Sequence, residues 1–235
     1  DKLKEIFEYI GNIDVWSSCT RLLNLGYSLV YTIPKSISPI ISVKNMSNPL
    51  FDKVKNDLIL KGQNMILSGP NAAGKTTLMK TLLINVVLAQ SLGISKCDKM
   101  VITEFDNILT NIKKTDEKLS LFQTEMKQIG EIIGKADQEK CLIAIDEMCS
   151  STNNTDANEI AVKIANKLSK TNSISIITTH LESLKTLNNT DFLNYHMKIN
   201  RDNEEVKYTY KLCEGVSNES TALDNINSLS IDIKK

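Results

Sequence analysis

The segment Gly69-Pro70-Asn71-Ala72-Ala73-Gly74-Lys75-Thr76 decides the fold. It fits the pattern G-x-x-x-x-G-K-[ST], in which a glycine-rich loop joins a strand to a helix. The apolar run Met65-Ile66-Leu67 precedes it, and apolar residues at helical spacing follow it: Leu78, Met79, Leu82, Leu83, Val86 and Val87. An ordinary glycine-rich turn is the alternative, but the flanking strand and helix favour a loop that binds a nucleoside triphosphate.

Each residue of this loop has an expected role. The backbone N–H groups and the positive end of the following helix bind phosphate oxygens. Lys75 reaches the β- and γ-phosphates, and the Thr76 hydroxyl binds Mg²⁺. The other expected nucleotide contacts come from Gly69, Pro70, Asn71, Ala72, Ala73, Gly74 and Thr77. The expected ligands are therefore a nucleoside triphosphate and Mg²⁺.

Two further apolar runs end in polar residues that suit this chemistry. Residues 141–145 predict a fully buried parallel strand that ends before Asp146 and Glu147, and residues 174–178 predict a second one that leads to His180. Ligands bind at the carboxyl edge of such sheets. We therefore expect Asp146 to hold Mg²⁺ through water, Glu147 to polarise the attacking water and His180 to bind the γ-phosphate or its water. Two solvated acids and a histidine bonded to backbone are the structural alternatives.

The remaining pattern predicts an α/β domain preceded by a short helical appendage. Near the N-terminus, helical spacing predicts two helices separated by Gly11-Asn12, the second of which ends at Gly26. We place the appendage at residues 1–36 and the nucleotide-binding domain at residues 37–235. Because the chain starts with Asp1 and opens directly into a helical pattern, we expect a fragment of a longer polypeptide.

Several strands and one helix can be placed beyond the phosphate loop. Residues 40–43, 100–103 and 107–112 read as strands, and residues 121–133 carry a helical apolar stripe. Two runs that alternate in period two predict an antiparallel hairpin. One face is expected to carry Tyr195, Met197 and Ile199, and the facing one Val206, Tyr208, Tyr210 and Leu212.

The composition excludes several classes of protein. Lys and Arg number 28 and Asp and Glu number 28, so no overall basic field attracts nucleic acid. Any contact with DNA is expected to be local or made by a part outside this chain. No apolar run reaches membrane-spanning length, no signal peptide is visible, and the five cysteines show no metal spacing. We expect an intracellular protein that does not bind a membrane.

Five segments, in this order, resemble the ATPase domain of MutS mismatch-repair proteins. They are Gly69–Thr76, Ser120–Met126, Ile145–Glu147, Thr152 with Asp156, and Thr178–His180. The S-x-F-x-x-E-M pattern of Ser120–Met126 separates this family from other phosphate-loop families. The resemblance covers roughly residues 40–225, and the overall character is similar to the divergent branch of giant viruses and octocoral mitochondria.

The resemblance implies a fold, a partner and two further roles. The fold is the P-loop NTPase of ABC-ATPase type, with a mostly parallel central sheet flanked by helices and an antiparallel hairpin. The domain works in a homodimer, or with a paralogue, in which Ser120 reaches the partner's nucleotide in trans and Asn71 helps place the γ-phosphate and water. The dimer is a clamp on DNA, which is held by domains absent from this chain. The nucleus, a cytoplasmic virus factory and the mitochondrion all remain open as locations.

Two departures from the family pattern stand out. The family usually carries G-x-G-T-S-T after Asp-Glu, whereas this chain has Cys149-Ser150-Ser151-Thr152-Asn153-Asn154, so the backbone there is expected to be less flexible. The family also tends to place an aromatic residue against adenine, whereas this chain has Lys53-Val54-Lys55. Val54 is the expected packing partner of the base, and selectivity for adenine over guanine stays open.

Two functions other than repair or recombination are alternatives. An ABC-type ATPase could serve a transporter or a ribosome-associated factor, but the L-S-G-G-Q signature of transporter ATPases is absent and Ser120–Met126 occupies its interval. A nucleotide-binding scaffold without turnover is the third reading. Glu147 argues against it, because an inactive site needs no base.

Overall fold

The computed structural model describes residues 2–34, 38–112, 121–149, 154–187, 190–202 and 205–216. Ser120 and Thr152, which the sequence analysis singled out, lie outside these ranges. None of the helices within them combines the length and the apolar character needed to cross a lipid bilayer.

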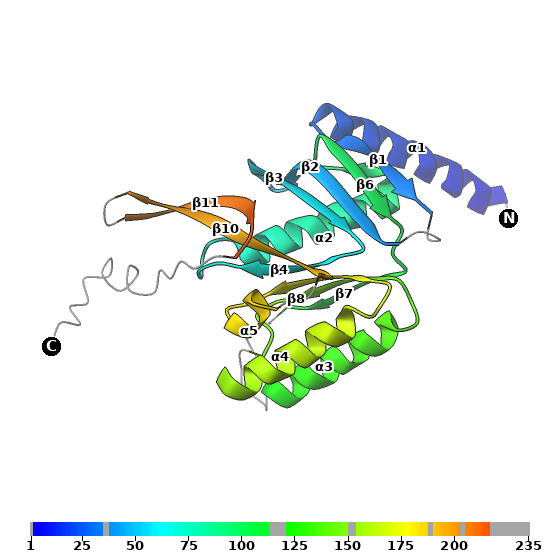
Figure 1. Ribbon diagram of the computed structural model, residues 1–235. Helices are drawn as coiled ribbons and strands as arrows, with labels where there is room; N and C mark the ends of the chain where they lie inside the picture. The colour runs from blue at the N-terminus through cyan, green and yellow to red at the C-terminus, as the bar shows by residue number, and fades with distance from the viewer. Residues whose placement is uncertain are drawn as a thin grey trace.

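A six-stranded sheet forms the centre of the molecule (Figure 1). In spatial order its strands are β11 (Glu205–Glu214), β10 (Phe192–Asp202), β4 (Asn64–Ser68), β9 (Ile174–Thr178), β8 (Cys141–Ile145) and β7 (Asn107–Asn111). All neighbours are parallel except β10 and β11, which form the predicted hairpin. Every residue of β4, β8 and β9 is buried, as near-continuous apolar runs require. The predicted mostly parallel sheet is thus confirmed.

A second sheet of five strands lies above the first, and α2 (Lys75–Leu92) lies between them (Figure 1). Its spatial order is β3 (Phe51–Lys61), β2 (Ile40–Asn48), β6 (Lys99–Thr103), β1 (Ser28–Ile33) and β5 (Ile94–Ser95). Helix α2 buries five of the six predicted apolar residues, but Val87 is 48% exposed. Val87 and Ile84 lie about one turn apart on a side of α2 that stays open to solvent. The helix predicted through these six apolar residues is confirmed.

Helices α3 (Leu121–Ala136) and α4 (Asn154–Leu168) cover the other face of the central sheet, with the short α5 (Glu182–Lys185) nearby (Figure 1). Alternation along β4 explains both layers. Met65 and Leu67 pack in the cluster around α2, whereas Ile66 packs in the cluster that holds α3 and α4. The sheet is therefore fixed from both sides, and its carboxyl edge is a rigid support for a site.

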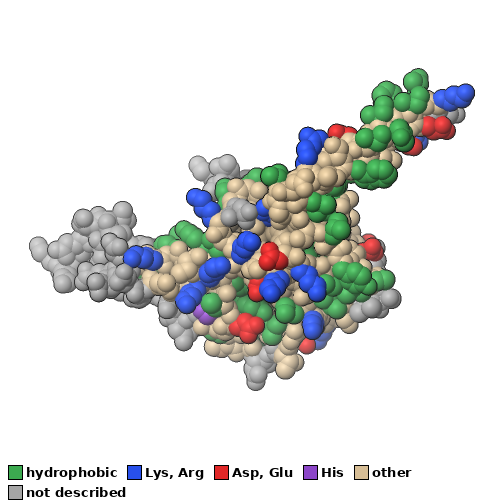
Figure 2. Space-filling view, turned by 90° about the horizontal axis from the view of Figure 1, so that it is seen from above, with side chains coloured by type: hydrophobic (Ala, Val, Ile, Leu, Met, Phe, Trp, Pro, Cys, Tyr) green, Lys and Arg blue, Asp and Glu red, His purple; other side chains and the backbone are tan. Residues whose placement is uncertain are grey.

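The N-terminal appendage differs from the prediction. One helix, α1 (Lys2–Asn24), runs without a break through Gly11 and Asn12, because a single mid-helix glycine costs only about 1 kcal/mol relative to alanine. None of its residues is buried, and hydrophobic side chains lie along its surface (Figure 2). Strand β1, which the sequence analysis did not identify, then pairs with β6. The domain boundary near residue 36 stays a prediction.

The hairpin carries an irregularity that the alternating pattern did not reveal. Lys198 pairs with Lys211, but the next residue of β10, Ile199, pairs with Tyr208. Thr209 and Tyr210 therefore bulge out of the ladder, and Tyr210 adopts a φ of 56°. Tyr210 is 46% exposed, and the predicted period-two alternation does not hold at this residue.

Candidate nucleotide site

The phosphate loop connects β4 to α2 and leaves the start of the helix open. Gly74 caps α2 with a φ of 95° and makes no side-chain capping bond, so the first N–H groups of the helix are available to an anion. A Cβ atom on Gly74 would lie 3.0 Å from Tyr210 Cδ1. Both the backbone conformation and this close approach therefore require glycine here.

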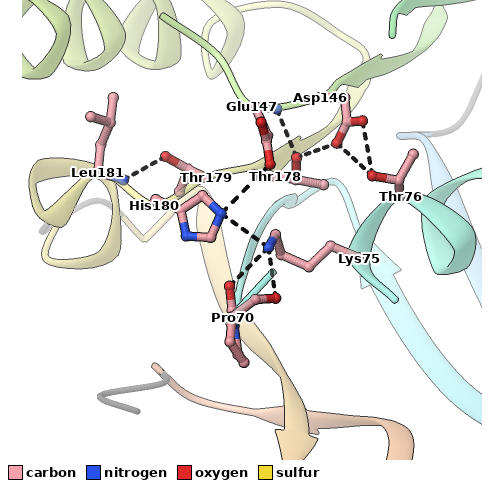
Figure 3. Close-up of polar contacts among 10 residues, drawn as sticks. Pro70, Lys75, Thr76, Asp146, Glu147, Thr178, Thr179, His180 and Leu181 are labelled. Carbon is pink, nitrogen blue, oxygen red and sulfur yellow. Dashed lines mark hydrogen bonds and ion pairs between the residues drawn. The ribbon is translucent and has the colours of Figure 1, made fainter. Parts of the chain in front are cut away.

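Lys75 lies at the centre of the loop (Figure 3). It is 5% exposed, and its ammonium donates to the carbonyl oxygens of Gly69 at 2.8 Å and Pro70 at 3.0 Å. Its Nζ is also 3.2 Å from His180 Nε2. Because an ammonium has only donors, His180 Nε2 must accept, which places the imidazole proton on Nδ1. The Lys75 ammonium is thus held at a place where phosphate oxygens could replace the two carbonyl oxygens as its hydrogen-bond acceptors.

Burial lowers the pKa of both Lys75 and His180, and the charge of Lys75 lowers the pKa of His180 further. For His180, burial is the first cause of the lowered pKa and the charge of Lys75 the second, while Glu147 opposes them. For Lys75, burial lowers the pKa, and Glu147 and Asp146 oppose it. A neutral His180 beside a charged Lys75 agrees with the hydrogen-bond geometry.

Asp146 joins the helix to two strand ends (Figure 3). Thr76 Oγ1 donates to Asp146 Oδ2 at 2.9 Å, and Thr178 Oγ1 donates to Asp146 Oδ1 at 2.6 Å. A hydroxyl beside a carboxylate is the oxygen ligand set that Mg²⁺ prefers, and one carboxylate suffices when substrate phosphates complete the shell. Within the described ranges, no group of three His, Cys, Asp or Glu side chains could hold a metal by itself. Thr76 and Asp146 therefore fit a metal that arrives with its nucleotide.

The side chain of Glu147, which follows the end of β8, points toward His180 and Lys75 (Figure 3). Its φ is 51°, and its N–H donates to Thr178 Oγ1 at 2.8 Å. Its Oε1 lies 3.6 Å from His180 Nε2, and its side chain is 38% exposed. Water can thus reach this carboxylate. We call Lys75, Thr76, Asp146, Glu147 and His180 the phosphate edge.

A cavity of about 240 Å³ is lined in part by Gly74 and Thr77 at the start of α2. We call it the side cavity, and its walls include Met46, Phe51, Val54, Met197 and Tyr210. Val54, the residue expected to pack on a base, is therefore in a cavity that adjoins the loop. The cavity brings together strands β2, β3, β10 and β11 with the start of α2.

Some predicted site residues meet in space and others stay apart. The five residues of the phosphate edge are contiguous, whereas Val54 belongs to the side cavity. Asn71 and Ala72 are exposed on the loop, and nothing in the described ranges tests the role given to Asn71. Ser120 lies outside those ranges.

The sequence analysis assigned no role in the site to three residues that the structure places there: Thr178, Phe51 and Tyr210. Thr178 stands at the end of its strand, where a hydroxyl beside Asp146 could have been expected. Phe51 and Tyr210 reach the side cavity from positions far apart in the chain. Asn56 fixes Tyr210 there, because its Nδ2 donates to Tyr210 O at 3.1 Å and its Oδ1 accepts from Leu212 N at 2.8 Å.

Comparison with known proteins points to one family. Residues 65–231 match the family model described as MutS domain V. A protein named Endonuclease MutS2 from Pediococcus pentosaceus is 27% identical over 242 residues, covering 99% of this chain and 30% of that protein. The MutS2 of Staphylococcus epidermidis strain RP62A is 33% identical over 204 residues, covering 82% and 26%. The DNA mismatch repair protein MSH3 of Candida glabrata is 27% identical over 250 residues, covering 97% and 24%.

The chain therefore spans 30% or less of the length of these relatives. They come from bacteria and a fungus, so the expected place in the giant-virus and octocoral branch finds no support. The match covers the phosphate loop, both carboxylates and His180. It agrees with the α/β architecture and the helix α2 enclosed between two sheets. The chain belongs to the MutS family and carries its domain V, an ATPase domain with the P-loop fold of ABC type.

Proposed function

We propose that this chain hydrolyses ATP at the phosphate edge and thereby switches a DNA clamp of a longer protein in mismatch repair or recombination. One observation carries the proposal. Thr76 on α2 and Thr178 on β9 both donate to Asp146, and the adjoining Glu147 faces Lys75 and His180. A phosphate cradle, a metal carboxylate and a candidate base thus lie at one sheet edge.

The triphosphate would replace partners that the loop now supplies to itself. Lys75 would exchange the carbonyls of Gly69 and Pro70 for the β- and γ-phosphates, which offer stronger, charge-assisted bonds. Mg²⁺, when bound through Thr76 and Asp146, would offset the phosphate charge. Asn71 on the exposed loop would help place the γ-phosphate and water.

Glu147 would act as the general base on the attacking water. Its carboxylate is exposed to solvent and lies near the ammonium of Lys75, which fits a water held between the base and a phosphate. His180 would leave Lys75 for the γ-phosphate or that water, once its proton lies on Nε2. The histidine would thereby sense whether the third phosphate is present.

The nucleobase would lie in the side cavity. Val54 offers apolar contact, and the exposed ring of Tyr210 can stack on a base. Two aromatic side chains line this cavity, Tyr210 on β11 and Phe51 at the start of β3. The residues Gly74 and Thr77 line this cavity and also belong to the phosphate loop, so one nucleotide could occupy both regions.

The working unit would be a dimer with a second copy or a paralogue, in which Ser120 completes the partner's site. DNA would be bound by parts of the protein outside this chain. The names of the relatives, an endonuclease and a mismatch-repair protein, favour this function over an ABC-type ATPase with a non-repair partner. Work on DNA implies a location inside the cell.

The test replaces Glu147 by Gln, which keeps the shape of the side chain and removes the base. Turnover should fall by at least about a hundredfold, whereas the affinity for ATP should stay nearly unchanged. Glu159→Gln on the exposed face of α4 is the matched control and should hydrolyse ATP at the parent rate. Hydrolysis by Glu147→Gln at the parent rate would show that another group acts as the base.

A further inference from the structure

The turn that follows β8 is strained at two residues. Glu147 has a φ of 51° and Cys149 a φ of 60°, a backbone region that residues with a Cβ atom rarely adopt. Met148 and Cys149 are 1% and 0% exposed and pack in the cluster that holds α3 and α4. The turn therefore keeps an unfavourable conformation inside a well-packed core, which requires specific contacts to maintain it.

Among the described residues, one hydrogen bond reaches each end of this turn. On the first side, the N–H of Glu147 donates to Thr178 Oγ1 at 2.8 Å. On the second side, the N–H of Cys149 donates to Glu125 Oε1 at 2.8 Å. Glu125 belongs to α3 and is only 8% exposed. A carboxylate that accepts a backbone N–H in such surroundings makes a strong, charge-assisted bond.

We propose that Glu125 is a positioning residue for Glu147. Its carboxylate fixes Cys149 in the left-handed conformation, and the fixed turn directs the Glu147 carboxylate toward Lys75 and His180. Without the bond, Cys149 would relax to a negative φ, and the backbone two residues away would turn with it. This inference rests on the proposed role of Glu147 as the base.

The first test replaces Glu125 in the whole protein by Gln, which keeps an acceptor oxygen, and by Met, which has similar length and no oxygen acceptor. Glu125→Met should lower kcat by about tenfold to a hundredfold, since a misplacement of about 1 Å can cost that much. The Kd for ATP should change less than about twofold, because the residues that hold phosphate are untouched. Glu125→Gln should restore most of kcat. The exposed Glu131, on the same helix, gives the control Glu131→Met, which should match the parent.

The second test uses a substitution that removes the strain. Glycine adopts a left-handed φ without steric cost, so Cys149→Gly should make the turn less dependent on Glu125. The loss of kcat caused by Glu125→Met should therefore shrink to at most about threefold when measured in the Cys149→Gly background. An equal loss in both backgrounds would mean that Glu125 acts only through core packing, and would overturn the proposal.

Thermal unfolding of each variant separates positioning from loss of the fold. If Glu125→Met does not fold, Glu125→Ala, which also lacks the acceptor oxygen, is measured alone and with Cys149→Gly, and the same shrinkage of the kcat loss is expected. Parent-rate hydrolysis by folded Glu125→Met, with Glu147→Gln inactive, would overturn this inference alone. Parent-rate hydrolysis by Glu147→Gln would overturn the proposed function as well.

Discussion

The phosphate edge and the side cavity both adjoin the phosphate loop, but different interactions hold them in place. The phosphate edge consists of polar side chains that bond to one another at the ends of neighbouring parallel strands. The walls of the side cavity are mostly apolar and come from strands of both sheets. Their arrangement depends on packing and on the bridge from Asn56 to the backbone of β11.

The triphosphate restricts the choice of site residues more strongly than the base does. Binding and cleaving a triphosphate needs particular groups, such as an ammonium, a hydroxyl and two carboxylates, at fixed places. An aromatic or apolar contact with a base can be supplied by many residues from many directions. The following changes should separate the two regions, and they are given from the largest expected effect to the smallest.

Lys75→Ala should abolish detectable binding of a non-hydrolysable ATP analogue and of inorganic tripolyphosphate. The change removes the buried ammonium that faces the loop carbonyls, where phosphates would bind. Calorimetric titration measures both ligands, and Lys80→Ala at an exposed position of α2 is the control. Unchanged affinity for tripolyphosphate would place the phosphates elsewhere.

Mixing two inactive variants asks whether a second chain completes the phosphate edge. Ser120→Arg should damage the element given to the partner, whereas Glu147→Gln damages a subunit's own base. A mixed dimer then contains one intact site. Equal amounts should give about a quarter of the parent rate, since about half of randomly formed dimers are mixed and each keeps one of two sites. No recovery, despite mixed dimers shown by native mass spectrometry, would restrict Ser120 to its own subunit's site.

Tyr210→Ala should weaken ATP binding by about tenfold, since stacking on an aromatic ring contributes roughly 1–3 kcal/mol per base. The affinity for tripolyphosphate should stay at the parent value, because the phosphate edge is untouched. Tyr31→Ala is the control, since that ring is 69% exposed on β1, outside the side cavity. Equal losses for both ligands would mean that Tyr210 supports the loop and not the base.

The smallest expected effect is a pH dependence of folding stability from His180. Its pKa is lowered, first by burial and then by Lys75, with a further lowering from Lys185 and an opposing effect of Glu147. The unfolded chain therefore takes up a proton near pH 6.5 before the native state does, and native stability falls as the pH drops below about 6.5. Urea unfolding at pH 7.5 and pH 5.5 should show a smaller difference for His180→Asn than for the parent. Identical differences would mean that His180 titrates normally, and solvent exposure keeps the effect modest.

The phosphate edge was largely predictable because short-range patterns specify it. The strand, loop and helix around Lys75 are consecutive, and Asp146, Glu147 and His180 directly follow buried runs. Parallel strands then bring these ends together without further information. The same reasoning gave the hairpin and the central sheet.

The side cavity could not be predicted, except for Val54, because tertiary packing determines it. The bulge at Thr209 and Tyr210 breaks an alternating pattern that is otherwise regular, and no local residue signals it. Strand β1 was also missed. Its apolar residues Leu29 and Tyr31 are exposed, so the strand does not show the alternation of apolar buried and polar exposed residues that predicts a strand. The two predicted N-terminal helices were wrong because Gly11 does not interrupt α1.

The non-glycine residues with a positive φ limit where substitutions could raise the melting temperature of this protein. Among described residues other than glycine, positive φ occurs at Asn45, Ala72, Glu147, Cys149 and Tyr210. Ala72 lies in the phosphate loop, Glu147 and Cys149 lie in the turn after β8, and Tyr210 lines the side cavity. Each such residue costs on the order of 1 kcal/mol, a noticeable fraction of a typical domain stability of about 5–15 kcal/mol. Glycine at such a position would relieve this strain, but it would also increase the conformational entropy of the unfolded chain and loosen the backbone beside the proposed ATP site. Thermostable variants with full turnover should therefore be sought elsewhere, for example among the glycines of α3, where Gly130 and Gly134 have open space around them.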